Sequence, residues 1–319
     1  LLAPPPPTDP DIDLRRSRMS PGRRFRDRLA TVLMGAAFLA ALIPLVFILV
    51  TVVGKGISVI RTEWFTHDIP DVASFVSSDK ADAFGIDASA FGTAKPVYGM
   101  QPAIVGTLLT TGLAALLAIP LGILGAIYLN EYGKRNRLAR TLRFFSDVMT
   151  GVPSIIMGIF LYTIFVVPQG LDGRSAIAGG LALACLMLPI VVRSTEEMLK
   201  LVPNSLREAS AALGTRTWRT TVGVVLPAAL GGVTSGCMLA VARAAGETAP
   251  ILLTVGSTRF TNWSLHGNNT SLSREIYANA TQPGGESLAW GAALTLIAVV
   301  LAMTLLARFV TSKLSIRAQ

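Results

Sequence analysis

Residues 208–227 read EASAALGTRTWRTTVGVVLP, a polar segment that lies between two long apolar stretches of the chain. Just before it, Asn204 and Ser205 are residue types that cap the beginnings of helices. The alanines of the segment favour helix, and Gly214 suits a helix end. The sequence therefore predicts a short helix over 204–214, followed by a basic return into the next apolar stretch.

The composition indicates an integral membrane protein. Of the 319 residues, 51% are hydrophobic and 15% are charged, whereas soluble domains carry roughly 25% charged residues. A net charge of +9 would suggest nucleic-acid binding in a soluble chain, but no basic run is interleaved with aromatic residues. Lys and Arg gathered in cytoplasmic loops are the simpler explanation of the charge.

Apolar stretches that can cross roughly 30 Å of hydrocarbon as helices of about 20 residues occur six times. They lie near 29–53, 103–129, 146–167, 176–192, 228–255 and 288–310. Glycines crowd these stretches, as expected where membrane helices pack closely; they include Gly122, Gly180, Gly231, Gly232 and Gly236. The predicted fold is an all-α integral membrane protein with six transmembrane helices.

The distribution of Lys and Arg predicts the sides of the membrane. Twenty Lys and Arg residues lie in the segments 1–28, 130–145 and 193–227 and at the C-terminal end. Seven lie in the loops at 54–102, 168–175 and 256–287. The positive-inside rule then places both termini in the cytoplasm. The predicted organisation is a disordered Arg- and Pro-rich cytoplasmic tail (1–28), a first transmembrane helix (29–53), an extracytoplasmic loop (54–102), a core of five transmembrane helices (103–310) with a cytoplasmic loop (193–227), and a cytoplasmic C-terminal tail (311–319).

Arg243 and Glu247 lie within the predicted span 228–255. An ionisable residue at such a depth is costly unless it is paired or faces a cavity, so it is a candidate functional residue. The two residues are four apart and share a helix face, and one interpretation is a purely structural ion pair. In the other, Arg243 offers its guanidinium to an oxyanion in a pore, and Glu247 positions Arg243 or accepts from a protonated anion oxygen.

Arg193 and Asp147 lie at the ends of predicted spans. Arg193, at the cytoplasmic end of the fourth span, either extends the anion path or anchors its helix at the membrane surface. Asp147 opens the third span, where the helix dipole accounts for a carboxylate; the alternative is a role in the pore.

Neither a metal site nor a catalytic site is predicted. The two cysteines, Cys185 and Cys237, are isolated in apolar stretches, and the two histidines, His67 and His266, lie in separate polar loops. No Walker A loop occurs in the sequence. The chain is therefore predicted to be neither an enzyme nor the holder of a cofactor.

The segment quoted first carries a spaced pattern. Its members are Glu208, Ala209, Ser210, Gly214, Leu226 and Pro227. This spacing resembles the signature loop of ABC importer permeases, the binding-protein-dependent transport inner-membrane components. Ser210 stands where that family usually has a second alanine.

The resemblance extends over most of residues 100–256. The stretches that carry it are GTLLTTGLAALLAIPLGILGAIYLNEY (106–132), GVPSIIMGIF (151–160), LPIVVRSTEEMLKLVPNSLREASAALGTRTW (188–218) and VVLPAALGGVTSGCMLAVARAAGETAPILLTVG (224–256). They are similar to the permease of the phosphate-specific importer. The run ARAAGETAP favours the PstA type, because the sister PstC type usually lacks the Ala-Pro after Gly-Glu-Thr.

The resemblance implies the ABC type I importer permease architecture and a permease subunit that moves inorganic phosphate inward. Its partners would be a PstC-like permease subunit, a dimer of PstB-like ATPases that holds ATP and Mg²⁺, and an extracytoplasmic phosphate-binding protein, at the bacterial inner membrane. The signature helix would dock on the ATPase, and Arg193 and Arg243 match the intramembrane arginines that the family needs for transport. An interfacial helix on lipid headgroups is the alternative for 204–214.

Several functions stay open from the residues alone, which favour only a small anion. A permease for sulfate or molybdate, or the sister PstC-type subunit, is the nearest alternative. A stand-alone anion channel or secondary transporter belongs to a different class and would conduct without an ATPase. A structural scaffold would need neither a docking loop nor charges inside the membrane.

Overall fold

A computed structural model describes residues 21–69, 99–133, 136–282 and 284–316. Every regular element within these ranges is helical, which confirms the predicted all-α class. The chain divides into two compact units, Leu1–Thr51 and Val52–Gln319.

The first unit contains most of helix α1, Pro21–Gly56, a 36-residue helix with an apolar middle. Its first turns, residues 21–28, belong to the tail that was predicted to be disordered, and there the prediction is wrong. Extending a helix costs little once it is nucleated, and proline is well suited to the first helical position. The rest of the predicted tail, 1–20, lies outside the described residues.

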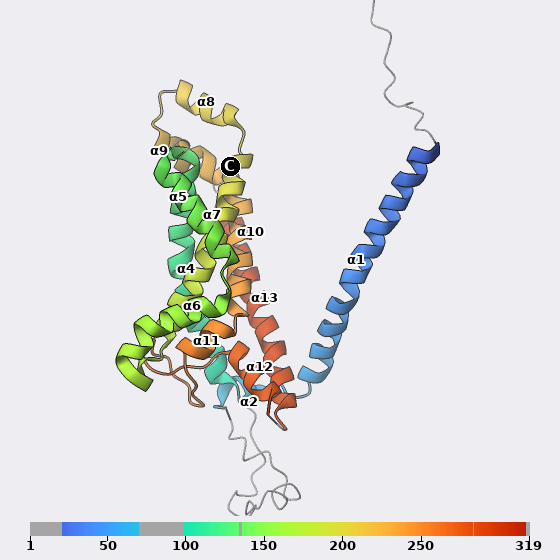
Figure 1. Cartoon of the computed structure of the whole chain (residues 1–319), viewed down its shortest axis with the longest axis vertical. Coiled ribbons are helices and arrows are strands. Elements are labelled where there is room, and N and C mark those ends of the chain that lie inside the picture. The colour runs from blue at the N-terminus through green and yellow to red at the C-terminus, as the bar shows by residue number, and fades with distance from the viewer. Residues whose placement is uncertain (1–20, 70–98, 134–135, 283, 317–319) are drawn as a thin grey trace, which may run out of the picture. The chain divides into compact units, whose positions relative to one another are not determined.

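The second unit is built around four long helices, α4 (Gln101–Ile127), α7 (Ala176–Leu201), α10 (Leu226–Ala245) and α13 (Glu286–Ile316). Shorter helical elements precede, connect or extend them: α2 (Thr62–Thr66), η4 (Tyr128–Tyr132), α5 (Arg137–Gly151), α6 (Ser154–Leu161), η5 (Tyr162–Val166), η6 (Val167–Gly173), α8 (Asn204–Ala212), α9 (Thr217–Thr220), η7 (Thr221–Val225), α11 (Ala249–Thr254) and α12 (Leu272–Ala280). Figure 1 shows α8 and α9 at one end of this unit and α2 and α12 at the opposite end.

Five helical segments among the described residues are long and apolar enough to cross a membrane. They are Phe25–Gly56, Gln101–Tyr132, Ala176–Leu201, Thr217–Ala245 and Glu286–Phe309. A sixth crossing exists only as a pair of helices, Arg137–Gly151 and Ser154–Gly170, which are bent by 104° relative to each other. The chain is thus a multi-span membrane protein, with five or six candidate spans among the residues that the structure describes.

The predicted third span, 146–167, is wrong as a continuous helix. Val152 is extended (φ −73°, ψ 128°), and Pro153 after it has ψ 135°. A residue before proline is disfavoured in the α region, and proline has no N–H to continue the hydrogen-bond ladder. Asp147 therefore lies near the C-terminal end of α5, four residues before Gly151, and not in the first turn of a span, so the predicted dipole explanation for it is wrong.

The predicted fifth span, 228–255, also differs from the structure. The helix begins earlier, so Leu226 and Pro227 open α10, and it ends at Ala245. After a break, α11 begins anew with Pro250 in its first turn, a position where proline is favoured. Pro250 therefore opens a separate helix and does not bend a continuous one.

Helix α7 is the central helix of the second unit. In its most apolar stretch 61% of the residues are buried, against 28% for α4 and 33% for the span that contains α10. Glycines let the neighbours approach it: a Cβ on Gly122 of α4 would lie 2.6 Å from Cγ1 of Val191, and one on Gly236 of α10 would collide with Oγ of Ser194. The predicted role of small residues at helix contacts is confirmed at these positions, whereas a Cβ on Gly231 would meet open space.

Candidate transport and coupling site

Helix α8 is the helix that the signature loop predicted. It begins after Pro203, whose backbone is extended. No side chain donates or accepts a capping hydrogen bond at this helix start. Capping by Asn204 or Ser205 is therefore a wrong prediction; Asn204 lies inside the helix, where its Oδ1 accepts from Arg207 at 3.3 Å. Gly214 follows the helix with φ +73°, a left-handed conformation that glycine adopts freely, as the sequence predicted.

A cluster of three hydroxyl groups joins α8 to α9. Oγ of Ser210 lies 2.6 Å from Oγ1 of Thr215 and 2.8 Å from Oγ1 of Thr220, and the two threonine oxygens are 3.0 Å apart. Ser210 is 9% exposed. From the sequence, Ser210 was expected only as a small replacement for alanine, and the cluster was not predicted. The cluster fixes the path of the chain from α8 to α9.

The outward face of α8 is partly apolar. Leu206 is 42% exposed and Leu213 is 84% exposed, and Ala209 and Glu208 are exposed between them. Leu206, Ala209 and Leu213 are spaced to lie on one helix face. This mixture of apolar and charged side chains suits packing against another protein. Leu226 and Pro227 lie apart from this face, at the start of α10.

Arg243 lies in the last turn of α10, and its guanidinium is exposed at the surface of the chain. Its side chain is 66% exposed, and Nε lies 3.8 Å from Oε1 of Glu247, whose side chain is 19% exposed. The backbone oxygen of Glu247 accepts from Oγ of Ser273 at 3.0 Å, which ties this stretch to α12. The predicted pair therefore exists, but its contact is long, and among the described residues most donors of the Arg243 guanidinium have no acceptor.

Arg193 is in a different situation, because two carboxylates share its guanidinium. Nε donates to Oε1 of Glu197 and Nη1 donates to Oδ1 of Asp147, both at 3.0 Å. The three side chains are 52–58% exposed. From the sequence, Asp147 was assigned to the start of a span or to the pore, and its contact with Arg193 was not predicted. In this arrangement Arg193 is neutralised twice, which leaves little attraction for an anion.

The two arginines are not brought together. Ser194, next to Arg193, touches Gly236 of α10, and Arg243 follows Gly236 by seven residues, or roughly 10 Å along a helix at 1.5 Å per residue. They are therefore two separate positions along the contact between α7 and α10.

Several charged residues that the sequence analysis did not single out form contacts at the same end as α8. Glu196, 2% exposed, accepts from Nε of Arg143 at 2.8 Å and pairs with Nζ of Lys200 at 2.8 Å. Arg207 of α8 pairs with Glu131 of η4 at 3.0 Å. The Glu196–Lys200 spacing of four residues is visible in the sequence, but the other two pairs join distant segments.

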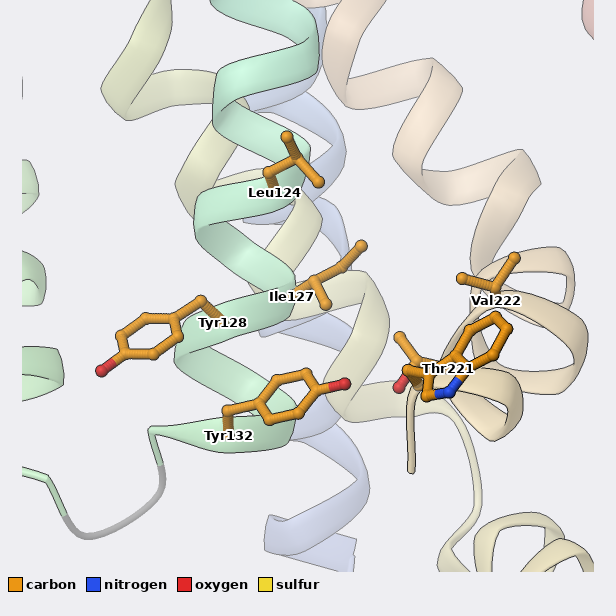
Figure 2. Close-up of a pocket in the computed structure, with 7 residues that line it drawn as sticks. Leu124, Ile127, Tyr128, Tyr132, Thr221 and Val222 are labelled. Carbon is orange, nitrogen blue, oxygen red and sulfur yellow. The ribbon is translucent and has the colours of Figure 1, made fainter. Parts of the chain in front are cut away.

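A groove of about 440 Å³ lies between the end of α4 and the segment α9–η7. Figure 2 shows Leu124, Ile127 and Tyr132 on one side and Thr221 and Val222 on the other. None of the described residues that line the groove is charged, so it is not a candidate for the anion path.

Comparison with known proteins agrees with this fold. Residues 118–316 match the family described as "Binding-protein-dependent transport system inner membrane component". A protein of Mycobacterium tuberculosis (strain ATCC 25618 / H37Rv) named "Phosphate transport system permease protein PstA 1" is 42% identical over 298 residues, which cover 91% of this chain and 90% of the relative. A "Phosphate transport system permease protein PstA" of Yersinia pestis is 39% identical and covers 95% of both chains.

A solved structure has the same fold. The chain from "Inward facing conformations of the MetNI methionine ABC transporter" superposes with a TM-score of 0.50 at 17% identity, over 68% of this chain and 93% of that chain. Both the family match and the relatives extend over more than half of the sequence. The chain therefore belongs to the family of binding-protein-dependent transport system inner membrane components.

Proposed function

We propose that this chain is the PstA-type permease subunit of an ATP-driven importer of inorganic phosphate. The observation that carries the proposal is the outward face of α8, with Leu213 84% exposed, in a chain whose relatives are named phosphate transport permeases. A partner ATPase that grips this face and closes around ATP and Mg²⁺ would tilt the helices between inward-open and outward-open states.

The substrate contact is assigned to Arg243. A guanidinium donates parallel hydrogen bonds to two oxygens of a tetrahedral oxyanion, and the outward-facing side chain of Arg243 has donors available for it. Glu247 holds the base of that side chain and accepts from a protonated phosphate oxygen. Arg193 becomes a second contact when an anion replaces Asp147 or Glu197.

The proposed assembly has this chain beside a PstC-like subunit and above two PstB-like ATPases. An extracytoplasmic phosphate-binding protein delivers phosphate to the end of the second unit that contains α12. Both termini and α8 lie in the cytoplasm of a bacterial cell, and the chain holds no cofactor of its own.

Uptake of radiolabelled phosphate in cells with and without this chain tests the proposal. We expect uptake that depends on the chain and that excess unlabelled phosphate abolishes, whereas excess sulfate or molybdate leaves it unchanged. Competition by sulfate or molybdate as strong as that by phosphate would assign the permease to another oxyanion.

A further inference from the structure

Arg207 connects α8, the helix proposed to dock on the ATPase, to two membrane helices. Its Nε and Nη2 donate to Oε1 of Glu131 in η4 at 3.3 and 3.0 Å. Nη2 also donates to the carbonyl of Leu199 at 2.8 Å, and Nη1 donates to the carbonyl of Val202 at 2.7 Å. One guanidinium thus joins α8, the C-terminal end of α7 and the extension of α4.

The pair is buried, unlike the pairs that Arg193 makes. The Arg207 side chain is 15% exposed and that of Glu131 is 6% exposed. A buried charge without its partner is strongly unfavourable. The carbonyls of Leu199 and Val202 belong to the end of α7, where carbonyls have no partner within the helix. Arg207 therefore satisfies a carboxylate and a helix end together, which the planar fork of arginine allows and a lysine does not.

The segment η4, which pairs with Arg207, is itself hydrogen-bonded to its surroundings. Asn130 donates from Nδ2 to the same Oε1 of Glu131 at 2.8 Å. The carbonyl of Leu129 accepts from Nη2 of Arg143 at 2.7 Å, and Nε of Arg143 donates to Glu196 of α7. This segment, η4, is a π turn, a departure from α-helix that recurs at functional positions. The ends of α4, α5 and α7 therefore form one connected body, to which Arg207 attaches α8.

We propose that the Arg207–Glu131 pair transmits the movement of the docked helix α8 to membrane helices α4 and α7. The inference rests on the proposed function, in which a partner ATPase moves α8. Without the pair, α8 loses its ion pair to η4, while the turn at Val202–Pro203 and the two carbonyls that Arg207 contacts still join it to α7, and the Ser210 hydroxyl cluster still joins it to α9. It would then move without carrying α4. Arg207 is a positioning residue in this account and makes no contact with phosphate.

The test is the number of phosphate ions moved per ATP hydrolysed, measured on one preparation of the complete complex in proteoliposomes. For Arg207→Gln we expect ATP hydrolysis within about twofold of the wild type and a phosphate-to-ATP ratio lower by about tenfold, a typical size for coupling between sites.

Glu131→Gln should lower the ratio similarly. The ratio of the double variant should be no lower than that of either single variant, and the ratio of Arg207→Lys should be intermediate. Arg140→Gln, an exposed arginine of α5, is the matched control and should leave the ratio unchanged.

A normal ratio in an assembled Arg207→Gln complex would overturn the proposal. Loss of assembly in all three single variants of the pair would also overturn it, because the pair would then only support folding. A wild-type complex that moves a different anion would contradict the proposed function instead. In that event the ratio measured with that anion still decides whether the pair transmits movement.

Discussion

Two arginines of the proposed path differ in what occupies their guanidinium groups. Arg243 has one long contact at 3.8 Å and is 66% exposed, whereas Arg193 donates to two carboxylates at 3.0 Å. An anion can bind Arg243 without displacing anything, but at Arg193 it has to compete. The two residues therefore have different expected responses to substitution.

Arg243→Ala should strongly lower phosphate flux when phosphate is below saturation. Hydrogen bonds to charged groups contribute about 1.5–3 kcal/mol, so losing the guanidinium should weaken phosphate binding by roughly ten- to a hundredfold. Phosphate flux in proteoliposomes at fixed protein content measures this. Arg243→Lys is the matched control and should retain part of the flux, because it keeps the charge but not the fork. Wild-type flux in Arg243→Ala would make the pair with Glu247 purely structural.

Asp147→Asn should strengthen phosphate binding. Exposed ion pairs contribute about 0.2–1 kcal/mol, so removing this competitor for Arg193 should lower the apparent KM for phosphate by up to about fivefold. The sign follows because a negative charge is removed where an anion has to bind. The KM of Glu197→Gln should move in the same direction. An increased KM in both variants would show that the carboxylates position Arg193 and do not compete with phosphate.

The sequence predicted candidate charges but not most of their partners. Arg243–Glu247 and Glu196–Lys200 are four residues apart, and helical periodicity brings such pairs together. Arg193–Asp147, Arg143–Glu196 and Arg207–Glu131 are 46, 53 and 76 residues apart. Their pairing depends on how α5, α7, α8 and η4 are packed, and the period of a single helix contains no such information.

Among the elements, α8 depends most directly on local sequence. Gly214 ends it because φ is +73°, and a Cβ at this position would meet no other atom within 4 Å. A substitution there acts through the backbone conformation alone, without disturbing neighbours. This makes Gly214 a clean position at which to test whether the shape of the loop matters.

Gly214→Val should uncouple ATP hydrolysis from transport. A β-branched residue in the left-handed region costs at least about 1–2 kcal/mol, which favours a different path for the chain between α8 and α9. Gly214→Asn should behave like the wild type, because asparagine tolerates this region. Phosphate-to-ATP ratios of both variants, with membrane insertion checked by immunoblot, measure the effect. An unchanged ratio in Gly214→Val would contradict the docking role of the loop.

Element boundaries were predictable where local chemistry determines them. The apolar stretches located α4, α7 and α13, and Gly214 located the end of α8. The Gly-Val-Pro-Ser step at 151–154 indicates the break at Val152–Pro153 from the sequence, although hydropathy alone runs the third span through it. The break at Gly246–Thr248 was not predicted, because hydropathy averages over a window longer than a break. The helical start of α1 was missed because the basic residues 21–28 lack an apolar face of their own.

At the scale of the whole molecule, the second unit has two unlike ends. One contains α8 and the ion pairs of Arg207 and Arg143, and the other contains α12 and the polar residues 257–271. The proposed orientation places the first end in the cytoplasm, where positively charged loops accumulate.

Cysteine labelling tests this orientation. Ser257→Cys and Arg137→Cys introduce exposed thiols at opposite ends of the second unit. We expect a membrane-impermeant maleimide to label Ser257→Cys in intact cells and Arg137→Cys only after permeabilisation. The chain without either substitution controls for labelling of Cys185 and Cys237. The reverse pattern would invert the proposed topology.

The most direct test is phosphate flux through the purified chain, alone and within the complete complex. The complex is reconstituted with the PstC-like subunit, the ATPase and the binding protein, and radiolabelled phosphate movement is followed with and without ATP. We predict flux only in the complete complex and only when ATP is hydrolysed, because α8 has to be moved by a partner. Phosphate flux through the chain alone, without an ATPase, would contradict this account and favour a channel or a secondary transporter.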